Sequence, residues 1–178
     1  MIRNPKDLQR YTAEERANHW IVGICFILLA LSGLAFFHPA FYPLTQLFGG
    51  GVWARILHPI IGWLMMIGFV VMYFRFKALN RMEPADREWL DRVGEMMDGN
   101  DHNMPEQGKY NGGQKAMFWA MSVCMLLLFV SGIILWRAYF SFPVDVVRLG
   151  AVVHAAVAAI MIAMIFVHVY AALWVRGT

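Results

Sequence analysis

The chain has 178 residues, of which 60% are hydrophobic and 15% charged, and it carries a formal net charge of +3. Its mean hydropathy of +0.52 is higher than a water-soluble domain of this length needs, so the composition indicates an integral membrane protein. The small positive charge follows from membrane topology, as argued below, and does not indicate a nucleic-acid partner.

Four apolar runs are each long enough to cross a bilayer as an α-helix, at about residues 18–37, 56–76, 116–136 and 147–175. The first run is too long for a signal peptide, lacks a small-residue cleavage site and is followed by three more runs. A capping box of Thr12 and Glu15 predicts that the first helix begins near Ala13. The sequence therefore predicts an all-α fold, a four-helix transmembrane bundle in which residues 1–178 form a single integral-membrane domain.

A polar connection, residues 78–114, lies between the second and third runs. Five of its apolar residues follow a helical spacing and predict a short amphipathic helix: Trp89, Leu90, Val93, Met96 and Met97. This helix is either purely structural or lies on the membrane surface or against a partner.

Two prolines mark expected helix starts. Pro143 is expected at an early position of the fourth helix, and Pro59 is tolerable if it lies near the first turn of the second. We find no internal repeat in the sequence.

Lys and Arg residues are distributed unevenly between the two sides of the predicted bundle. One side carries Arg3, Lys6, Arg10, Arg16, Arg75, Lys77, Arg81, Arg87, Arg92, Lys109, Lys115 and Arg176, and the other carries Arg55, Arg137 and Arg148. The positive-inside rule places the richer side, with both chain termini, in the cytoplasm. We therefore expect a multi-pass protein of the bacterial inner membrane.

His154 and His168 lie fourteen residues apart in the last apolar run. At about 100° per residue, fourteen residues end within about 40° of whole turns, so both imidazoles share one helix face. At about 1.5 Å per residue they lie roughly 21 Å apart, against a hydrocarbon core of about 30 Å. One helix therefore offers a nitrogen ligand near each membrane surface.

Two more histidines match these by depth. His19 lies at the cytoplasmic end of the first span with His168, and His58 lies at the outer end of the second span with His154. Each pair can ligate one haem iron axially through neutral imidazole nitrogens, which predicts two haems. Gly33 lies fourteen residues after His19, at the outer level, where it can leave space beside the outer cofactor.

Other interpretations of these histidines remain open. A single histidine in a membrane helix often forms an interhelical hydrogen bond or an interfacial anchor. Zinc is a weaker alternative because it prefers about four ligands at one level, with cysteine or carboxylate among them. His38 and His102 have no partner at their own depth and are left out of the site.

The segment from Gly108 to Lys115 precedes the third span on the cytoplasmic side. Asn111 as N-cap with Gln114 three residues later is typical of a capping box. In a second interpretation, Gly113 lets backbone approach a planar ligand while the Asn111 and Gln114 amides donate to a carbonyl oxygen. The residues alone leave both interpretations open.

Four stretches together resemble the membrane cytochrome b (gamma) subunit of respiratory formate dehydrogenases. They are Glu15–Trp20, Arg55–Pro59, Gly108–Lys115, and the segment from His154 through His168 to Thr178. The resemblance covers nearly the whole chain, and more distant relatives are the cytochrome b subunits of nickel-iron hydrogenases. Family members usually continue beyond the last helix into a basic tail, whereas this sequence ends at Thr178.

The resemblance implies two b-type haems, with His19 and His168 on the inner iron and His58 and His154 on the outer. It also implies a menaquinone or ubiquinone site near Asn111, Gly113, Gln114 and His168. The implied partners are an iron–sulfur (beta) subunit and a molybdenum or tungsten catalytic (alpha) subunit, in a complex open to higher oligomerisation. Formate oxidation would reside in the alpha subunit, so no residue of this chain is expected to be catalytic in that step.

The resemblance implies a membrane electron-transfer subunit, and two other functions remain open beside it. The same scaffold would serve a hydrogenase or another periplasmic oxidoreductase. A haem-free membrane anchor or small transporter is an alternative of another class, and it predicts no visible absorption.

Overall fold

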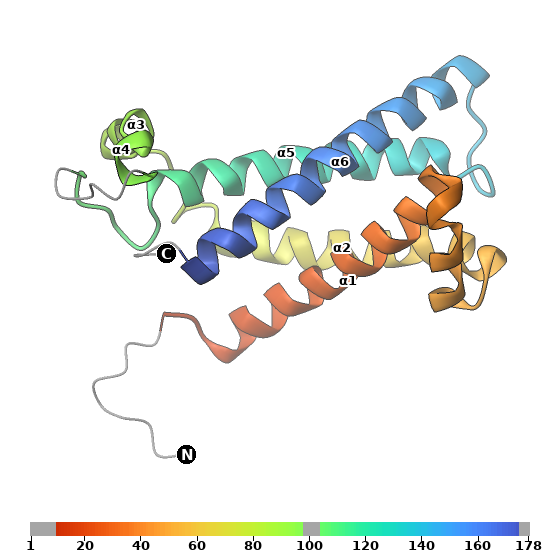
Figure 1. The fold of residues 1–178 in the computed structure, drawn as a ribbon, viewed down its shortest axis with the longest axis horizontal. Coiled ribbons are helices and arrows are strands. Elements are labelled where there is room, and N and C mark those ends of the chain that lie inside the picture. Colours follow the sequence, from red (N-terminus) through yellow and green to blue (C-terminus); the bar gives the residue numbers. More distant parts are fainter. Residues whose placement is uncertain (1–9, 98–103, 175–178) are drawn as a thin grey trace. The chain divides into compact units, whose positions relative to one another are not determined.

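The computed structural model describes residues 10–97 and 104–174. Several residues considered above lie outside this part: Arg3, Lys6, His102, residues 175–178 with Arg176, and the side chains of Met96 and Met97. Helices are the regular secondary structure of the described residues, which contain no strand (Figure 1). The elements in chain order are α1 Ala13–Phe37, η1 Pro39–Phe48, α2 Gly51–Phe76, α3 Pro84–Asp91, α4 Val93–Met97, α5 Gly112–Leu135 and α6 Val144–Trp174.

Four of these helices are long and apolar enough to cross a membrane: α1, α2, α5 and α6. They confirm the four predicted spans, and each begins three to five residues earlier than the apolar run alone suggested. These additional residues are the first turns of the helices, and each of these turns includes a charged residue. The Thr12 capping box is confirmed, because Thr12 Oγ1 accepts from the Glu15 amide at 3.2 Å and Glu15 Oε2 from the Thr12 amide at 2.7 Å.

The chain divides into two compact units, Met1–Met72 and Tyr73–Thr178. The first unit contains α1, η1 and most of α2, and the second contains α3 to α6 with the end of α2. The 3₁₀-helix η1 occupies the connection after α1, where His38 caps it by accepting the Ala40 amide on Nδ1 at 3.2 Å. Gly49 and Gly50 end η1 with φ of 87° and 98°, which a residue with a Cβ rarely adopts.

The expectation that the sequence contains no repeat is wrong. The two units carry the same or similar residues at positions 99 apart, from the helix caps to the last turns of the first long helix. The pairs are Thr12 and Asn111, Glu15 and Gln114, Trp20 and Trp119, Cys25 and Cys124, Ser32 and Ser131, and Gly33 and Gly132. The shared apolar character of membrane helices hides this similarity, because it appears in only a few polar or small residues.

Pro59 does not lie near the first turn of its helix. Since α2 begins at Gly51, Pro59 is the ninth residue, two turns inside. Having no amide hydrogen, it cannot donate to the carbonyl of Arg55. Pro143 is one residue outside α6 and accepts the Val147 amide at 3.1 Å, so it precedes the helix that it was expected to begin.

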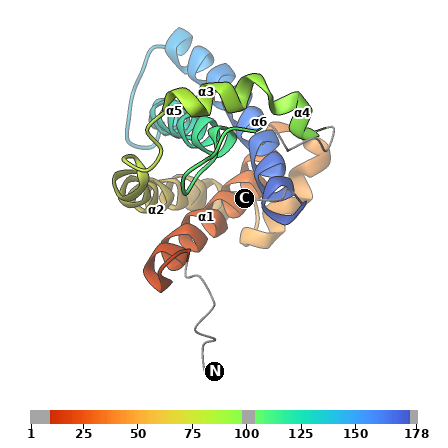
Figure 2. The same cartoon turned by 90° about the vertical axis from the view of Figure 1, so that its left-hand side faces the viewer.

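The amphipathic segment forms two short helices, α3 and α4, that meet at Arg92. Trp89 is 6% exposed, and its ring lies against Gly113 at the start of α5, where an added Cβ would be 2.9 Å away. Figure 2 shows α3 lying across this end of α5. The apolar side of α3 therefore packs on its own chain, which favours the structural interpretation at Trp89.

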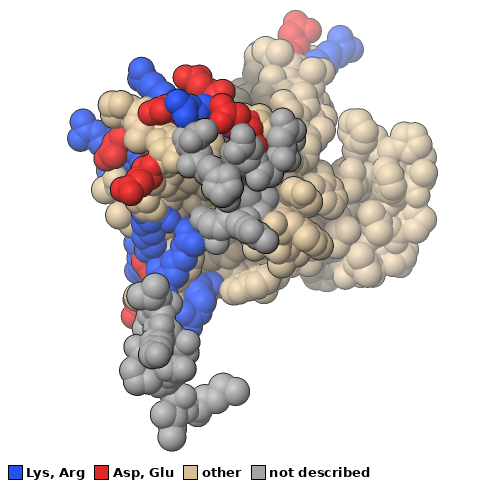
Figure 3. All heavy atoms as spheres, turned by 60° about the vertical axis from the view of Figure 1, so that its left-hand side comes forward, with Lys and Arg blue, Asp and Glu red and all other residues tan. Residues whose placement is uncertain are grey.

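Charged side chains gather where α3 and α4 lie, whereas other residues cover the flanks of the long helices (Figure 3). The long helices expose many large apolar side chains, including Trp63, Leu126 and Phe166. This distribution suits helices whose sides face lipid and whose connections face water.

Candidate functional site

His58 is held inside the first unit by a residue of α1. Its Nδ1 lies 2.7 Å from the hydroxyl oxygen of Ser32. The ring also meets Phe36 edge to face, with centroids 5.9 Å apart. The Ser32 hydroxyl donates in turn to the Leu28 carbonyl at 2.8 Å, one helical turn back.

His154 has the same arrangement in the second unit. Its Nδ1 lies 2.9 Å from the hydroxyl oxygen of Ser131 on α5. That hydroxyl donates to the Leu127 carbonyl at 2.6 Å. Sequence reasoning missed both serines, although each is the residue directly before a glycine in the repeated segment.

A glycine lies beside each of these two histidines. A Cβ added to Gly33 would lie 3.6 Å from His58 Cε1, and one added to Gly132 would lie 3.5 Å from His154 Cε1. Both distances are ordinary van der Waals contacts. Gly33 therefore lies at the level of His58, as the helix spacing predicted, and Gly132 repeats this in the second unit.

The two histidines predicted at the inner level occupy different elements. His19 lies in the second turn of α1, and its ring meets Trp20 edge to face with centroids 6.0 Å apart. His168 lies near the end of α6, which is continuous from His154 onward. At about 1.5 Å per residue, the two α6 histidines are therefore about 21 Å apart along one helix, as expected.

Each unit thus contributes two of the four histidines: His19 and His58 in the first, His154 and His168 in the second. The structure brings His58 and His154 each against a serine of its own unit. The assignment of the four to two irons stays a prediction. Among the described residues, no three His, Cys, Asp or Glu side chains are grouped in a way that could hold a metal ion.

The Asn111–Gln114 capping box is present and leaves the second interpretation open. Asn111 Oδ1 accepts the Gln114 amide at 2.9 Å, and Gln114 Oε1 accepts the Asn111 amide at 3.1 Å. Both side-chain oxygens are therefore used in the cap. The two NH₂ groups are oriented by these bonds and remain available as donors, which is what recognition of a carbonyl oxygen requires.

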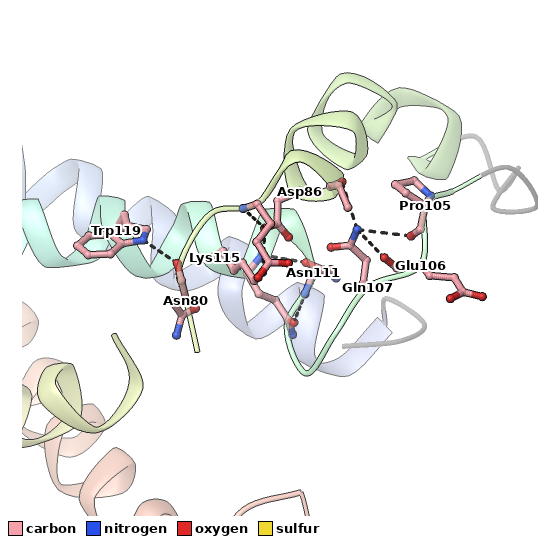
Figure 4. A network of polar contacts seen from close by, with 11 residues as sticks. Asn80, Asp86, Pro105, Glu106, Gln107, Asn111, Lys115 and Trp119 are labelled. Carbon is pink, nitrogen blue, oxygen red and sulfur yellow. Dashed lines mark hydrogen bonds and ion pairs between the residues drawn. The ribbon is translucent and has the colours of Figure 1, made fainter. Parts of the chain in front are cut away.

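A buried ion pair lies directly behind this cap. Lys115 Nζ contacts Asp86 Oδ2 at 2.8 Å, with the two side chains only 8% and 3% exposed. Figure 4 shows Asp86 of α3 facing Lys115 beside Asn111. The same Asp86 oxygen accepts the Glu83 amide at 2.7 Å, so one carboxylate caps α3 and binds α5. Sequence reasoning missed this pair because its members are far apart in the chain.

The glycines of the segment serve close packing. A Cβ on Gly112 would lie 2.5 Å from the Asp86 carbonyl oxygen, and one on Gly113 would lie 2.9 Å from the Trp89 ring. A side chain at Gly112 would meet the backbone of α3, and one at Gly113 would displace the Trp89 ring, so both glycines serve packing apart from any role toward a ligand. The expected contact of Gly113 with a ligand, and that of His168, stay predictions.

Comparison with known proteins identifies the family of this chain. The model of the prokaryotic cytochrome b561 family matches residues 10–178. The cytochrome b556(fdo) subunit of formate dehydrogenase from Escherichia coli K12 is 44% identical over 171 residues, which are 95% of this chain and 80% of that protein. The nitrate-inducible cytochrome b556(Fdn) subunit from the same strain is 44% identical over 92% of this chain and 76% of its own length. The formate dehydrogenase cytochrome b556 subunit of Haemophilus influenzae is 38% identical over 99% and 75%.

The chain belongs to the prokaryotic cytochrome b561 family. It is thus a membrane electron-transfer cytochrome b and, with four spanning-length helices, a multi-pass bacterial membrane protein. The family implies haem b, whose iron takes imidazole nitrogen as an axial ligand. His58 and His154 fit this role, because each offers an imidazole whose ring is oriented by a serine contact at Nδ1.

Proposed function

We propose that this cytochrome b561 is the membrane subunit of a respiratory formate dehydrogenase. It would pass electrons from a periplasmic partner through two b haems to quinone on the cytoplasmic side. The observation that carries the proposal is the similarity to formate dehydrogenase cytochrome b556 subunits over 95% of the chain. The Nδ1 contacts of His58 and His154 support it independently of that similarity.

Residues 1–178 would act as one dihaem domain in the bacterial inner membrane. Its outer iron would bind His58 and His154, and its inner iron would bind His19 and His168. The haems supply the one-electron chemistry, while the protein supplies the axial ligands and the polarity around them.

Quinone, either menaquinone or ubiquinone, would bind beside the inner haem. The amide donors of Asn111 and Gln114 would hydrogen-bond a quinone carbonyl oxygen, with Gly113 and His168 close by. The capping box supports this role because it fixes both amides through their oxygen atoms. Positive-inside topology places this segment and both termini in the cytoplasm, so the protons of quinol formation would come from there.

The partners would be an iron–sulfur (beta) subunit and a molybdenum- or tungsten-containing catalytic (alpha) subunit, with lipid around the helices. Electrons moving inward across the membrane, with protons taken up inside, build the membrane potential. A charge crossing 100 mV corresponds to about 2.3 kcal/mol. The complex is open to further oligomerisation.

A direct experiment is purification of the tagged chain from its native membranes. The expected result is two b-type haems per chain in a reduced-minus-oxidised spectrum, co-purified partner subunits, and formate-dependent reduction of a quinone analogue. Two haems with hydrogen-dependent reduction instead would assign the chain to a hydrogenase. A purified chain without visible absorption would contradict the proposal and favour a haem-free membrane anchor.

A further inference from the structure

Ser32 and Ser131 are isolated polar side chains in apolar helices. Their exposed fractions are 0% and 3%. Ser32 is the only Ser or Thr within α1, while α2 and α6 contain none. A buried hydroxyl needs a partner to offset the loss of its hydration. Each of these serines has three partners, two carbonyls of its own helix and a histidine nitrogen.

Each serine hydroxyl has one hydrogen, and the acceptor of that hydrogen determines which ring nitrogen of the histidine is protonated. Ser32 donates that hydrogen to the Leu28 carbonyl at 2.8 Å, and Ser131 donates to Leu127 at 2.6 Å. The serine oxygen then meets the histidine Nδ1 as an acceptor, which is the arrangement of the tautomer with its hydrogen on Nδ1. A neutral imidazole protonated on Nδ1 has its lone pair on Nε2, the form that can bind iron through Nε2.

The same chain of bonds occurs once in each unit. Ser32 and Ser131 are 99 residues apart, the histidines that they contact are 96 apart, and the two serine–histidine distances are 2.7 and 2.9 Å. A chance contact with a nearby hydroxyl would not be expected twice at equivalent positions. Each unit therefore pairs a buried serine of its first long helix with a histidine of its second.

We propose that Ser32 and Ser131 are positioning residues that hold both axial ligands of the outer haem in one tautomer and lower its reduction potential. The inference rests on the proposed assignment of His58 and His154 to one iron. It extends that assignment to two residues that do not contact the iron.

The effect on potential follows from ligand basicity. A hydrogen bond from Nδ1–H to an acceptor makes the imidazole a stronger donor to the metal. The serine oxygen is a better acceptor when its own hydrogen is donated to a carbonyl, because hydrogen bonds in a chain polarise one another. A stronger donor favours ferric over ferrous iron. Removing either hydroxyl should therefore raise the potential of the outer haem.

The test uses the intact complex from membranes carrying Ser32→Ala, Ser131→Ala or both. A matched control is Ser122→Ala, since Ser122 lies on the same helix as Ser131 and donates to the Phe118 carbonyl at 2.7 Å. Redox titration of the two haem bands and the EPR spectrum of the ferric haems are measured. We expect each serine variant to shift one haem upward in potential, the same haem in both, with the larger shift in the double variant and none in Ser122→Ala.

Ser32→Thr and Ser131→Thr separate the hydroxyl from packing, because they keep the oxygen. Wild-type potentials in these variants, including where the alanine variants lose the outer haem, support the proposal. Unchanged potentials in both alanine variants, or threonine variants that behave like alanine, would overturn it while leaving the dihaem function intact. Upward shifts in two different haems would overturn the pairing of His58 with His154. A wild-type complex without haem would overturn the proposed function itself.

Discussion

The two units are alike around His58 and His154 and differ at the other end of their helices. In both, a serine and a glycine of the first long helix contact a histidine of the second. At the other end the repeat breaks down. His19 of the first unit corresponds to Phe118 of the second, 99 residues later. The two units therefore repeat the serine–histidine contact and differ at the opposite end, where the first unit has a histidine and the second a phenylalanine.

The two capping boxes show the same divergence. Thr12 and Glu15 form an exposed cap that does no more than begin α1. Asn111 and Gln114 form the equivalent cap of α5, but it is partly buried and lies beside the Asp86–Lys115 pair. In the second unit, α3 packs against the end of α5 that carries this cap. This end of the second unit is also where the quinone site is proposed.

The largest effect is expected from removing a histidine that both units share. His58→Ala and His154→Ala should each abolish the outer haem and so remove about half of the haem, since one iron would lose an axial ligand. Haem content and reduced-minus-oxidised spectra measure this. His38→Ala is the matched control, because His38 caps η1 and should leave both haems in place. Full haem content in His154→Ala would refute the assignment.

The histidines that break the repeat should behave differently. His19→Ala and His168→Ala are expected to damage the inner haem and quinone reduction together, because both would lie at the level of the quinone. Haem spectra and a quinone-analogue assay are run on the same preparations. Normal quinone reduction in His168→Ala would show that this histidine does not belong to the inner site.

The buried Asp86–Lys115 ion pair of the second unit gives the next largest effect. Asp86→Asn or Lys115→Met leaves one buried partner without its counter-charge, which typically costs about 3–5 kcal/mol. The outer haem should keep its spectrum while α3 detaches from α5, and quinone reduction should fall. Thermal unfolding and limited proteolysis of the 78–114 connection report the change. Matching stability in Asp86→Asn and wild type would mean that the pair does not hold α3.

Much of this molecule is predictable from its sequence because a membrane leaves little choice of architecture. Apolar length predicts the four spans, and helical spacing places His154 with His168 and Gly33 beside His58. The contacts of Ser32 and Ser131 are not predictable in this way, since a membrane serine usually bonds its own helix and here does that as well. The packing of Trp89 on Gly113 was also missed, because its spacing equally suits a helix lying on lipid.

The smallest effect on stability, and the sharpest comparison of the two units, comes from the capping boxes. Thr12→Val and Asn111→Leu each remove a side-chain cap and should each cost about 0.5–2 kcal/mol. If Asn111 only caps, melting curves and inhibitor affinity will change alike in both variants. We expect instead that Asn111→Leu and Gln114→Leu weaken binding of a quinone-site inhibitor about tenfold, near the loss of one hydrogen bond, while Thr12→Val and Glu15→Leu leave it unchanged. Both haem bands should persist in all four variants, because no histidine is altered. Equal inhibitor affinity in the four variants would show that the Asn111–Gln114 cap only begins its helix, as the Thr12–Glu15 cap does.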